Sequence, residues 1–278
     1  MKRLPLLIFA LAALPVFADC DVRGVDPDAP VLCGNAVQGG FLYGESDWQV
    51  MNEAKMFCSS IQCAWWGEDG IFVIGIPMDA DESLKLRFCK DKKCKTFDYK
   101  IKRRKYIEQR VKVDEKFIEY PPEIQKRIDS ENEKIAAARG MFDASFAEFM
   151  DWKYPFRKKY PVSGAYGSRR VFNGVQKSPH KGWDIAAPKG TPVRSIERGR
   201  VVLAIDSYMS GKTVMVSHGY GIFSLYAHLD KTSAKPGAVV TADSVLGTVG
   251  ATGRASGPHL HLGLYFGQTP LDPELLFE

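Results

Sequence analysis

The chain has 278 residues, of which 45% are hydrophobic and 26% charged, and its formal net charge at pH 7 is +5. Its one long apolar run, the 14 residues from Leu4 to Phe17, is too short to span a bilayer comfortably, and no other stretch approaches a membrane span. The sequence therefore argues against stable membrane insertion, and its length fits two ordinary domains.

Residues 1–18 have the features of a cleaved secretory signal. A charged start at Lys2 and Arg3 precedes the apolar run, and the stretch ends on the small residue Ala18. We therefore expect an exported protein whose mature chain starts near Asp19. A lipid anchor on the next cysteine is disfavoured, because this aspartate occupies the position where a small residue is expected.

Residues 19–117 are predicted to form a small antiparallel β domain. In "LKLRFC", residues 84–89, and in "TFDYKIK", residues 96–102, apolar and polar side chains alternate. This period of two indicates half-buried strands. The intervening "KDKK", residues 90–93, reads as the turn of a hairpin.

The cysteines all lie in the first hundred residues: Cys20, Cys33, Cys58, Cys63, Cys89 and Cys94. An even number of cysteines in an exported chain predicts disulfides. We expect neighbours in the sequence to pair, as 20–33, 58–63 and 89–94, because the last two bonds would each close a tight turn. A zinc knuckle made by the last four cysteines is the alternative, which their spacing favours less.

Residues 118–153 are predicted to form a helical linker. The pair Pro121-Pro122 ends the β region and can start a helix, since proline is tolerated in a first turn. Isoleucines follow at near-helical spacing on a mostly charged surface. We expect this helix to end around Gly140, and a second short helix can follow it up to Trp152.

Residues 154–278 are predicted to form an antiparallel all-β domain. Glycine and proline are frequent, and short apolar runs such as "GRVVLAI" and "KTVMVSH" lie between turns. Helical periodicity is absent. The pattern is typical of a β domain of catalytic size.

The stretch "PHLHLGLYF", residues 258–266, contains two of the five histidines of the chain, His259 and His261. Alternate residues of a strand project to the same face. Both imidazoles would then lie on one face, while the intervening leucines would enter a core on the other. Two surface histidines on a half-exposed strand are the alternative.

A second motif, "PHKGWDIAAP" at residues 179–188, places His180 four residues before Asp184. A loop leading into a strand could turn both side chains to one point. Zinc binds imidazole nitrogen and carboxylate oxygen, and a catalytic site uses three protein ligands and one open position. His180, Asp184 and one of His259 and His261 would form such a set. A hydrogen-bonded pair in a loop is the alternative for the first two residues.

The candidate for proton transfer is a histidine, because the chain lacks HExxH and no glutamate lies in these motifs. His228, in "FSLYAHLD", can exchange a proton near neutral pH. Strand alternation places it on the face of Ser224 and Tyr226. His218 is interpreted as a strand-end histidine, with a substrate contact as the alternative.

Three stretches, "SPHKGWDIAAPKGTPV", "SLYAHL" and "ATGRASGPHLHLGLY", closely resemble the lysostaphin/LytM-type zinc endopeptidases, in the order and spacing of that family. The resemblance is strongest over about residues 155–276. The preceding β region and helix are similar, more weakly, to those ahead of the peptidase in some Gram-negative members. The resemblance implies an antiparallel β-sheet domain whose groove holds one zinc ion, and hydrolysis of peptide bonds in cell-wall peptidoglycan.

The resemblance also assigns roles to individual residues. It implies that His180, Asp184 and His261 are the zinc ligands and that His228 and His259 are the catalytic histidines. Strand geometry alone leaves open which of His259 and His261 is the ligand. Every residue of the motifs is present, which argues against a metal-free member.

The resulting prediction is an exported zinc-dependent endopeptidase that hydrolyses peptide cross-links of peptidoglycan. Its partners would be peptide stems and cross-bridges, with no nucleic acid and with a regulatory protein left open. Disulfides and a simple export signal favour the periplasm of a Gram-negative bacterium, and there the family resemblance implies a D-alanyl–diaminopimelate bond. The alternatives are a non-catalytic regulator or activator of another wall hydrolase, and a peptidoglycan-binding module.

Charge is divided unevenly along the chain, with a net of −4 over residues 19–154 and +7 over residues 155–278. A basic half can attract an acidic polymer or dock on the acidic half, so the first half could cover the peptidase groove. The run "KIKRRK", residues 100–105, is interpreted as a solvated strand face. Arg254 and Ser256 are placed along the groove by their position before the paired histidines.

Overall fold

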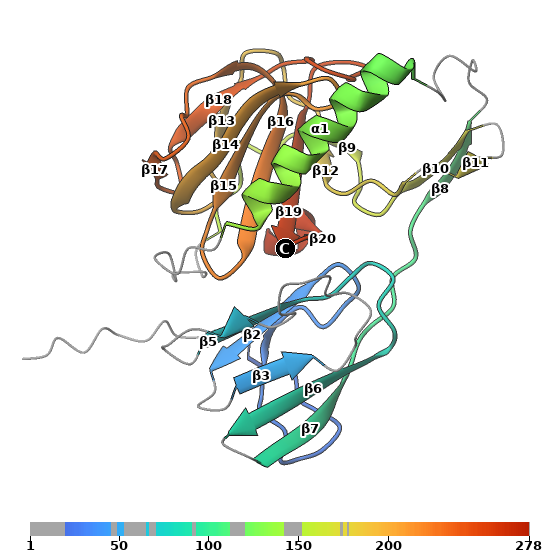
Figure 1. Ribbon diagram of the computed structural model, residues 1–278, viewed down its shortest axis with the longest axis vertical. Coiled ribbons are helices and arrows are strands. Elements are labelled where there is room, and N and C mark those ends of the chain that lie inside the picture. Colours follow the sequence, from blue (N-terminus) through green and yellow to red (C-terminus); the bar gives the residue numbers. More distant parts are fainter. Residues whose placement is uncertain are drawn as a thin grey trace, which may run out of the picture.

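The computed structural model describes residues 20–45, 49–52, 65–66, 71–90, 93–111, 120–141, 152–172, 175–176 and 178–277. Within these ranges the protein is mainly β, as predicted, with a single α-helix. Figure 1 shows a smaller N-terminal part below a larger part that contains the helix and the remaining strands.

Two small antiparallel sheets make up the N-terminal part. Its strands are β1 (Cys33–Gly34), β2 (Phe41–Glu45), β3 (Gln49–Asn52), β4 (Trp65–Trp66), β5 (Ile71–Gly75), β6 (Ser83–Lys90) and β7 (Lys93–Lys100). One sheet has the order β1-β2-β5-β4 and the other β3-β6-β7. Side chains from both sheets form one core. In β6 and β7 the buried residues alternate with exposed ones, which confirms the predicted hairpin.

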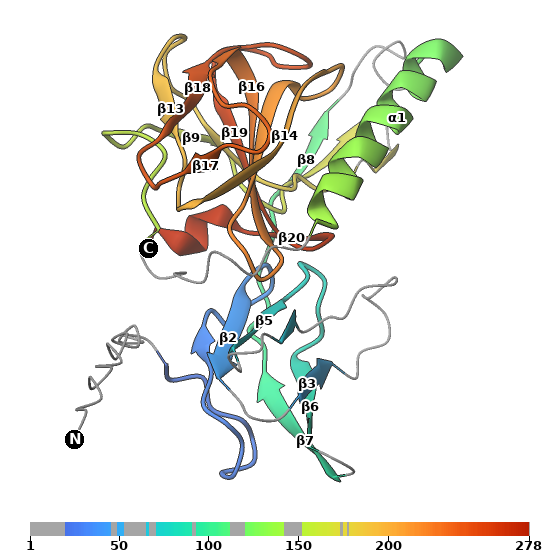
Figure 2. The same cartoon turned by 60° about the vertical axis from the view of Figure 1, so that its left-hand side comes forward.

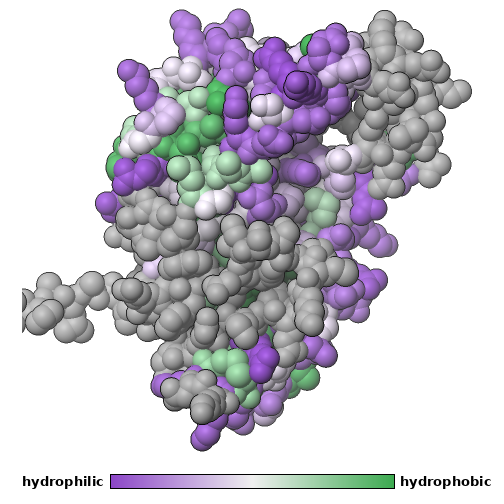
Figure 3. Space-filling view, in the orientation of Figure 1, coloured by the Kyte–Doolittle hydropathy of each residue, from purple (hydrophilic) through white to green (hydrophobic). Residues whose placement is uncertain are grey.

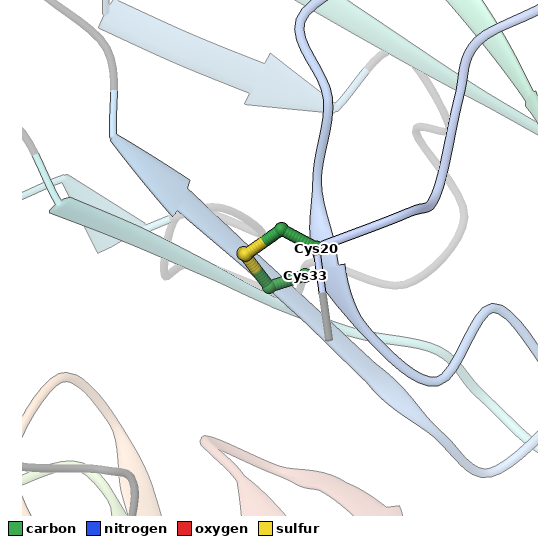
Figure 4. The surroundings of a disulfide bond; sticks show 2 residues. All are labelled: Cys20 and Cys33. Carbon is green, nitrogen blue, oxygen red and sulfur yellow. A yellow bond between two sulfur atoms is a disulfide. The ribbon is translucent and has the colours of Figure 1, made fainter. Parts of the chain in front are cut away.

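Two of the predicted disulfides are confirmed. Cys20 is bonded to Cys33 (Figure 4), and Cys89 is bonded to Cys94, which faces it across the β6–β7 hairpin. The alternative zinc knuckle is wrong, because two of its four thiols are bonded to each other. The predicted pair 58–63 lies outside the described residues.

The α-helix, α1 (Pro122–Arg139), begins at the proline pair and ends before Gly140, as predicted. Besides connecting the two parts of the chain, this helix packs against the C-terminal part. Ala138 is buried against the large sheet of the C-terminal part, and the Arg139 guanidinium lies 4.5 Å from the ring centroid of Tyr265 in strand β19 (Leu260–Phe266) of that sheet. In Figure 1, α1 crosses in front of that sheet. The second helix expected before Trp152 lies outside the described residues.

A ten-stranded sheet organises the C-terminal part, with the order β17-β14-β15-β16-β19-β12-β9 and three further strands attached. Its strands are β9 (Val162–Gly164), β12 (Trp183–Ile185), β13 (Pro192–Arg194), β14 (Gly199–Ser207), β15 (Gly211–Ser217), β16 (Ile222–Thr232), β17 (Val239–Val240), β18 (Val245–Val249), β19 (Leu260–Phe266) and β20 (Thr269–Leu271). A 3-10 helix, η2 (Pro273–Leu276), follows β20.

A smaller sheet stands beside it, in which β8 (Glu108–Val111) and β11 (Val175–Gln176) flank β10 (Arg169–Phe172). The β8–β10 pairing is parallel, whereas the β10–β11 pairing is antiparallel.

The large sheet buries apolar side chains on both faces. The leucines of β19 at 260, 262 and 264 enter the main core, as alternation predicted, and complete burial of a leucine contributes about 2 kcal/mol. On the opposite face, Tyr265 packs with Phe223, Leu225 and Ala227 beneath α1. The helix therefore covers part of the same face to which His261 belongs.

The N-terminal and C-terminal parts meet where β5 lies against β19 and β20, a contact visible in both ribbon views (Figures 1 and 2). The side chain of Asn35 also donates to the carbonyl of Leu275 in η2. The Arg104 guanidinium forms an ion pair with Asp272, whose side chain is 1% exposed. The backbone N–H of Asp272 donates to the carbonyl of Gly39. The interpretation of residues 100–105 as a solvated face is therefore wrong for Arg104, although Arg103 is exposed.

The surface in the view of Figure 3 is largely hydrophilic over the C-terminal part, with one hydrophobic patch at its upper left. Exposed valines of this part include Val239 of β17 and Val245 of β18. Among the described helices, none is sufficiently long and apolar to cross a bilayer.

We predict that Arg104→Ala destabilises the protein by about 2 kcal/mol, because it leaves the buried Asp272 carboxylate without its cation. Urea unfolding followed by tryptophan fluorescence measures the difference. Arg103→Ala is the matched control, since its ion pair with Glu82 is solvent-exposed and contributes little. Equal stabilities for the two variants would contradict this account of the junction.

Candidate metal centre and its histidines

The antiparallel pairing of β12 with β19 brings Asp184 directly opposite His261. Oδ1 of Asp184 lies 2.8 Å from Nδ1 of His261. Nε2 of His180, from the loop before β12, lies 3.0 Å from each of these two atoms. Three side chains that the sequence analysis singled out thus meet at one point, and among the described residues they form the group suited to hold a metal ion.

Backbone groups fix the direction of the His180 ring. Its Nδ1 lies 3.0 Å from the carbonyl oxygen of Ala165, which can accept its proton and leave Nε2 for the cluster. The backbone N–H of His180 donates to Ser168, and the carbonyl of His180 accepts from Gly167. The segment just before β10 therefore holds both the backbone and the ring of this histidine.

Glycines make room for the cluster. A Cβ on Gly182 would lie 2.8 Å from Nε2 of His261 and would also press on the backbone of Leu262. Gly164 of β9 faces Asp184 across the sheet, and a side chain there would collide with the carboxylate. Larger residues at these two positions would displace the side chains that form the cluster.

His228 lies on the opposite face from the one predicted. Tyr226 and Ser224 point into the main core, whereas the His228 ring lies 4.7 Å from the ring of His259, measured between centroids. The cause is a β-bulge, in which Ala227 and His228 together face the single residue Thr213 of β15. His228 has a φ of 60°, and this turn of the backbone carries its side chain to the metal-centre side.

Two carbonyl groups orient the histidines beside the cluster. Nδ1 of His228 lies 2.8 Å from the Thr252 carbonyl oxygen, and Nδ1 of His259 lies 2.8 Å from that of Gly257. If each Nδ1 donates its proton there, each Nε2 is left as the reactive nitrogen. Nε2 of His259 is 3.9 Å from Oδ1 of Asp184, farther than the corresponding atoms of His180 and His261.

Burial and hydrogen bonding set the charges of these groups. Burial alone would raise the pKa of Asp184, but the neighbouring imidazole rings of His180 and His261 hold this pKa well below its ordinary value. Burial lowers the pKa of His261 and lowers the pKa of His228 to about 4. At neutral pH the carboxylate is therefore charged and both of these imidazoles are neutral.

This donor set fits a divalent transition-metal ion. The ligand atoms of His180, Asp184 and His261 lie within 4.8 Å of one another, and two imidazoles with one carboxylate are a usual zinc set. Neutral imidazole and ionised carboxylate are also the forms that bind metal. Three protein ligands would leave a fourth position open for water or substrate.

His218 lies apart from the centre, directly after the last residue of β15, as the strand-end interpretation predicted, and it is buried. Its Nδ1 lies 2.8 Å from the carbonyl oxygen of Arg198, and its Nε2 lies 2.7 Å from the hydroxyl of Ser224. Ser224 is in turn hydrogen-bonded to the hydroxyl of Tyr226 in the main core. With 1% of its surface exposed, His218 is a poor candidate for a substrate contact.

The sequence analysis missed the groups that orient the histidines. They are backbone carbonyls of Ala165, Thr252 and Gly257, which carry no signal in the residue type. Arg254, placed along the groove by position, donates to the hydroxyl of Tyr120 just before α1. Ser256 is exposed in the same loop.

Residues 178–273 match Peptidase family M23. Over 121 residues the chain is 35% identical to peptidoglycan DD-endopeptidase ShyA of Vibrio cholerae, covering 43% of this chain and 28% of that protein. Over 94 residues it is 42% identical to DD-carboxypeptidase/endopeptidase Mpg of Neisseria meningitidis, covering 34% of this chain and 22% of that protein. The aligned parts span about a third or less of these curated relatives.

A crystal structure from Pseudomonas aeruginosa, assigned to the same M23 peptidase family, is similar over most of the chain. It superimposes with a TM-score of 0.64 at 28% sequence identity and covers 87% of this chain and 94% of that one. The likeness therefore extends over the N-terminal part as well as over the residues that match the family.

We predict that His218 makes the folded protein sensitive to acid. Burial lowers the pKa of His218 to about 4, from 6.5 in the unfolded chain. The unfolded state then binds more protons between these values, so the contribution of His218 to stability is complete above pH 6.5 and is lost as the pH falls towards 4. Between pH 7 and 5 the loss is about 2 kcal/mol.

Urea unfolding of the metal-free protein at the two pH values measures this loss. Other titrating groups are common to the wild type and to His218→Gln, so the comparison isolates His218. We expect His218→Gln to be less stable at pH 7 but to lose less stability on acidification. Equal losses in both proteins would show that His218 does not titrate in this way.

Proposed function

We propose that the chain is an exported zinc-dependent endopeptidase, because residues 178–273 match Peptidase family M23 and carry the motifs described above. The proposed substrate is the set of peptide cross-links in bacterial cell-wall peptidoglycan. Relatives named as peptidoglycan DD-endopeptidases support this substrate class.

The observation that carries the proposal is the meeting of His180, Asp184 and His261 within 4.8 Å. We assign these three residues as the zinc ligands and His228 and His259 as the catalytic histidines. The different distances from Asp184 support this division, because His261 reaches the carboxylate at 2.8 Å and His259 only at 3.9 Å.

Bound zinc would supply Lewis acidity towards the scissile carbonyl group and towards water. Proton transfer and stabilisation of the developing charge would be performed by side chains of the protein. Neutral His228 can accept a proton at Nε2, because its Nδ1 is engaged by Thr252. His259 is held in the same way by Gly257. A protonated imidazole at either position can donate to the oxygen that becomes negative during attack.

The domain organisation is proposed from the sequence. We propose a secretory signal at 1–18, a disulfide-containing β domain at 19–117, a helical linker at 118–153 and the peptidase domain at 154–278. The disulfides support export. We propose the periplasm of a Gram-negative bacterium as the compartment. The family resemblance favours a D-alanyl–diaminopimelate bond as the bond that is cleaved.

We predict that the zinc-loaded protein cleaves peptide cross-links in purified Gram-negative sacculi, so that later digestion of the glycan strands with a muramidase releases uncross-linked muropeptides, identified by mass spectrometry. A chelator should abolish the release, and zinc but not magnesium should restore it, since nitrogen ligands favour zinc. Binding to sacculi without release would favour a peptidoglycan-binding module. Stimulation of another hydrolase without release would favour a regulator.

We predict that His261→Ala and His228→Ala lose activity for different reasons. His261→Ala removes a ligand, so both zinc content and muropeptide release should be lost. His228→Ala should retain zinc and lose turnover by about 100-fold or more, as expected for a proton-transfer group. Zinc content measured by mass spectrometry separates the two cases, and full turnover in either variant would refute its assigned role.

A further inference from the structure

His228 depends on contacts outside its own strand for its backbone conformation. Its φ of 60° lies in the left-handed region, which a residue with a side chain adopts only when its surroundings impose it. The backbone N–H of His228 donates to the carbonyl oxygen of Ser210 at 2.8 Å. Ser210 belongs to the turn between β14 and β15, so the position of this turn affects the position of the His228 ring.

The β14–β15 turn, residues 207–210, is itself a closely bonded unit. The hydroxyls of Ser207 and Ser210 lie 2.6 Å apart, and the backbone N–H of Ser210 also donates to Ser207. The carbonyl of Met209 accepts the backbone N–H of Arg254 at 2.9 Å. The turn therefore contacts both the bulge that carries His228 and the loop that leads to His259.

Glu131 of α1 connects this turn to the helix. One carboxylate oxygen accepts the backbone N–H of Tyr208 at 2.8 Å, and the other forms an ion pair with Arg127 at 2.8 Å. The Glu131 side chain is only 14% exposed. Although burial would raise its pKa, the bonds from Arg127 and Tyr208 keep this pKa below its ordinary value, so the carboxylate is charged.

The helix that carries Glu131 is anchored independently of the turn. Near its C-terminal end, Ala138 is buried in the cluster beneath α1, and Arg139 lies over the Tyr265 ring. The side chain of Gln268 donates to the carbonyl of Ala136. These contacts hold α1 against the sheet face that includes the metal centre, so α1 is a fixed support for the turn.

We infer that Glu131 is a positioning residue for the catalytic reaction, which holds the β14–β15 turn and, through Ser210, sets the bulge that aims His228 at the metal centre. This inference rests on the proposed function for its catalytic consequence. The connection itself consists of two hydrogen bonds joined by the turn, from the Tyr208 N–H to Glu131 and from the His228 N–H to Ser210. It can be tested without measuring catalytic activity.

The test compares Glu131→Ala with Glu131→Gln in the zinc-loaded full-length protein. Alanine removes the acceptor for the Tyr208 N–H, whereas glutamine retains a carbonyl oxygen that can accept it. Glu133→Ala is the matched control, because Glu133 is exposed on the same helix. Amide hydrogen exchange at His228, resolved by NMR, reports on its bond to Ser210.

In Glu131→Ala we expect faster exchange at His228, a kcat about ten-fold lower and a KM within about two-fold of the wild type, because misplaced catalytic groups slow the chemical step. Zinc content should not change. Glu131→Gln should regain most of the kcat and of the exchange protection, and Glu133→Ala should behave as the wild type. A purely structural role would instead lower zinc content and active fraction, without a separate change in kcat per zinc-loaded molecule.

Unchanged exchange at His228 and unchanged kcat in Glu131→Ala would overturn the inference. The proposed function fails in a different way, because the wild type itself would then release no muropeptides. Exchange at His228 still decides the inference in that case, since faster exchange in Glu131→Ala supports the connection and unchanged exchange refutes it.

Discussion

The antiparallel register between β12 and β19 is the constraint on which the metal centre depends. It sets Asp184 opposite His261, while the adjoining strands set Gly164 opposite Asp184 and Ala227 opposite His261. These four residues form a row across β9, β12, β19 and β16, in which two small residues flank the two that can bind a metal. A slip of one residue between β12 and β19 would turn Asp184 to the other face of the sheet.

The bulge in β16 determines the face of the sheet on which His228 lies. Without it, alternation would direct His228 into the main core beside Tyr226, where an imidazole could not reach the metal centre. A left-handed residue costs on the order of 1–3 kcal/mol. The hydrogen bonds of His228 to Ser210 and Thr252 offset part of that cost, and both partners belong to connections between strands.

Features set by nearby residues could be predicted from the sequence, and features set by distant ones could not. Alternation placed the leucines of β19 in the core, and the proline pair and Gly140 marked the ends of α1.

The face of His228 was predicted wrongly, because the bulge depends on turns and loops that alternation does not describe. The partner of Arg104 was missed because Asp272 is 168 positions away in the chain. The choice of His261 over His259 as a ligand came from family resemblance and stays a proposal, while the structure places His261 at 2.8 Å and His259 at 3.9 Å from Asp184.

The junction at β20 affects how fragments of this protein can be interpreted. Asp272 and the backbone around it are bonded to the N-terminal part, and Gly75 of β5 packs so closely on Phe266 that a Cβ there would lie 2.8 Å from it. Removing the chain up to and including Arg104 would expose these surfaces to water and loosen β20, the direct neighbour of the strand that carries His261. A truncated protein with altered activity would thus report on a damaged sheet edge as well as on any lost inhibitor. Substitutions at the outer surface of the intact chain would separate the two effects.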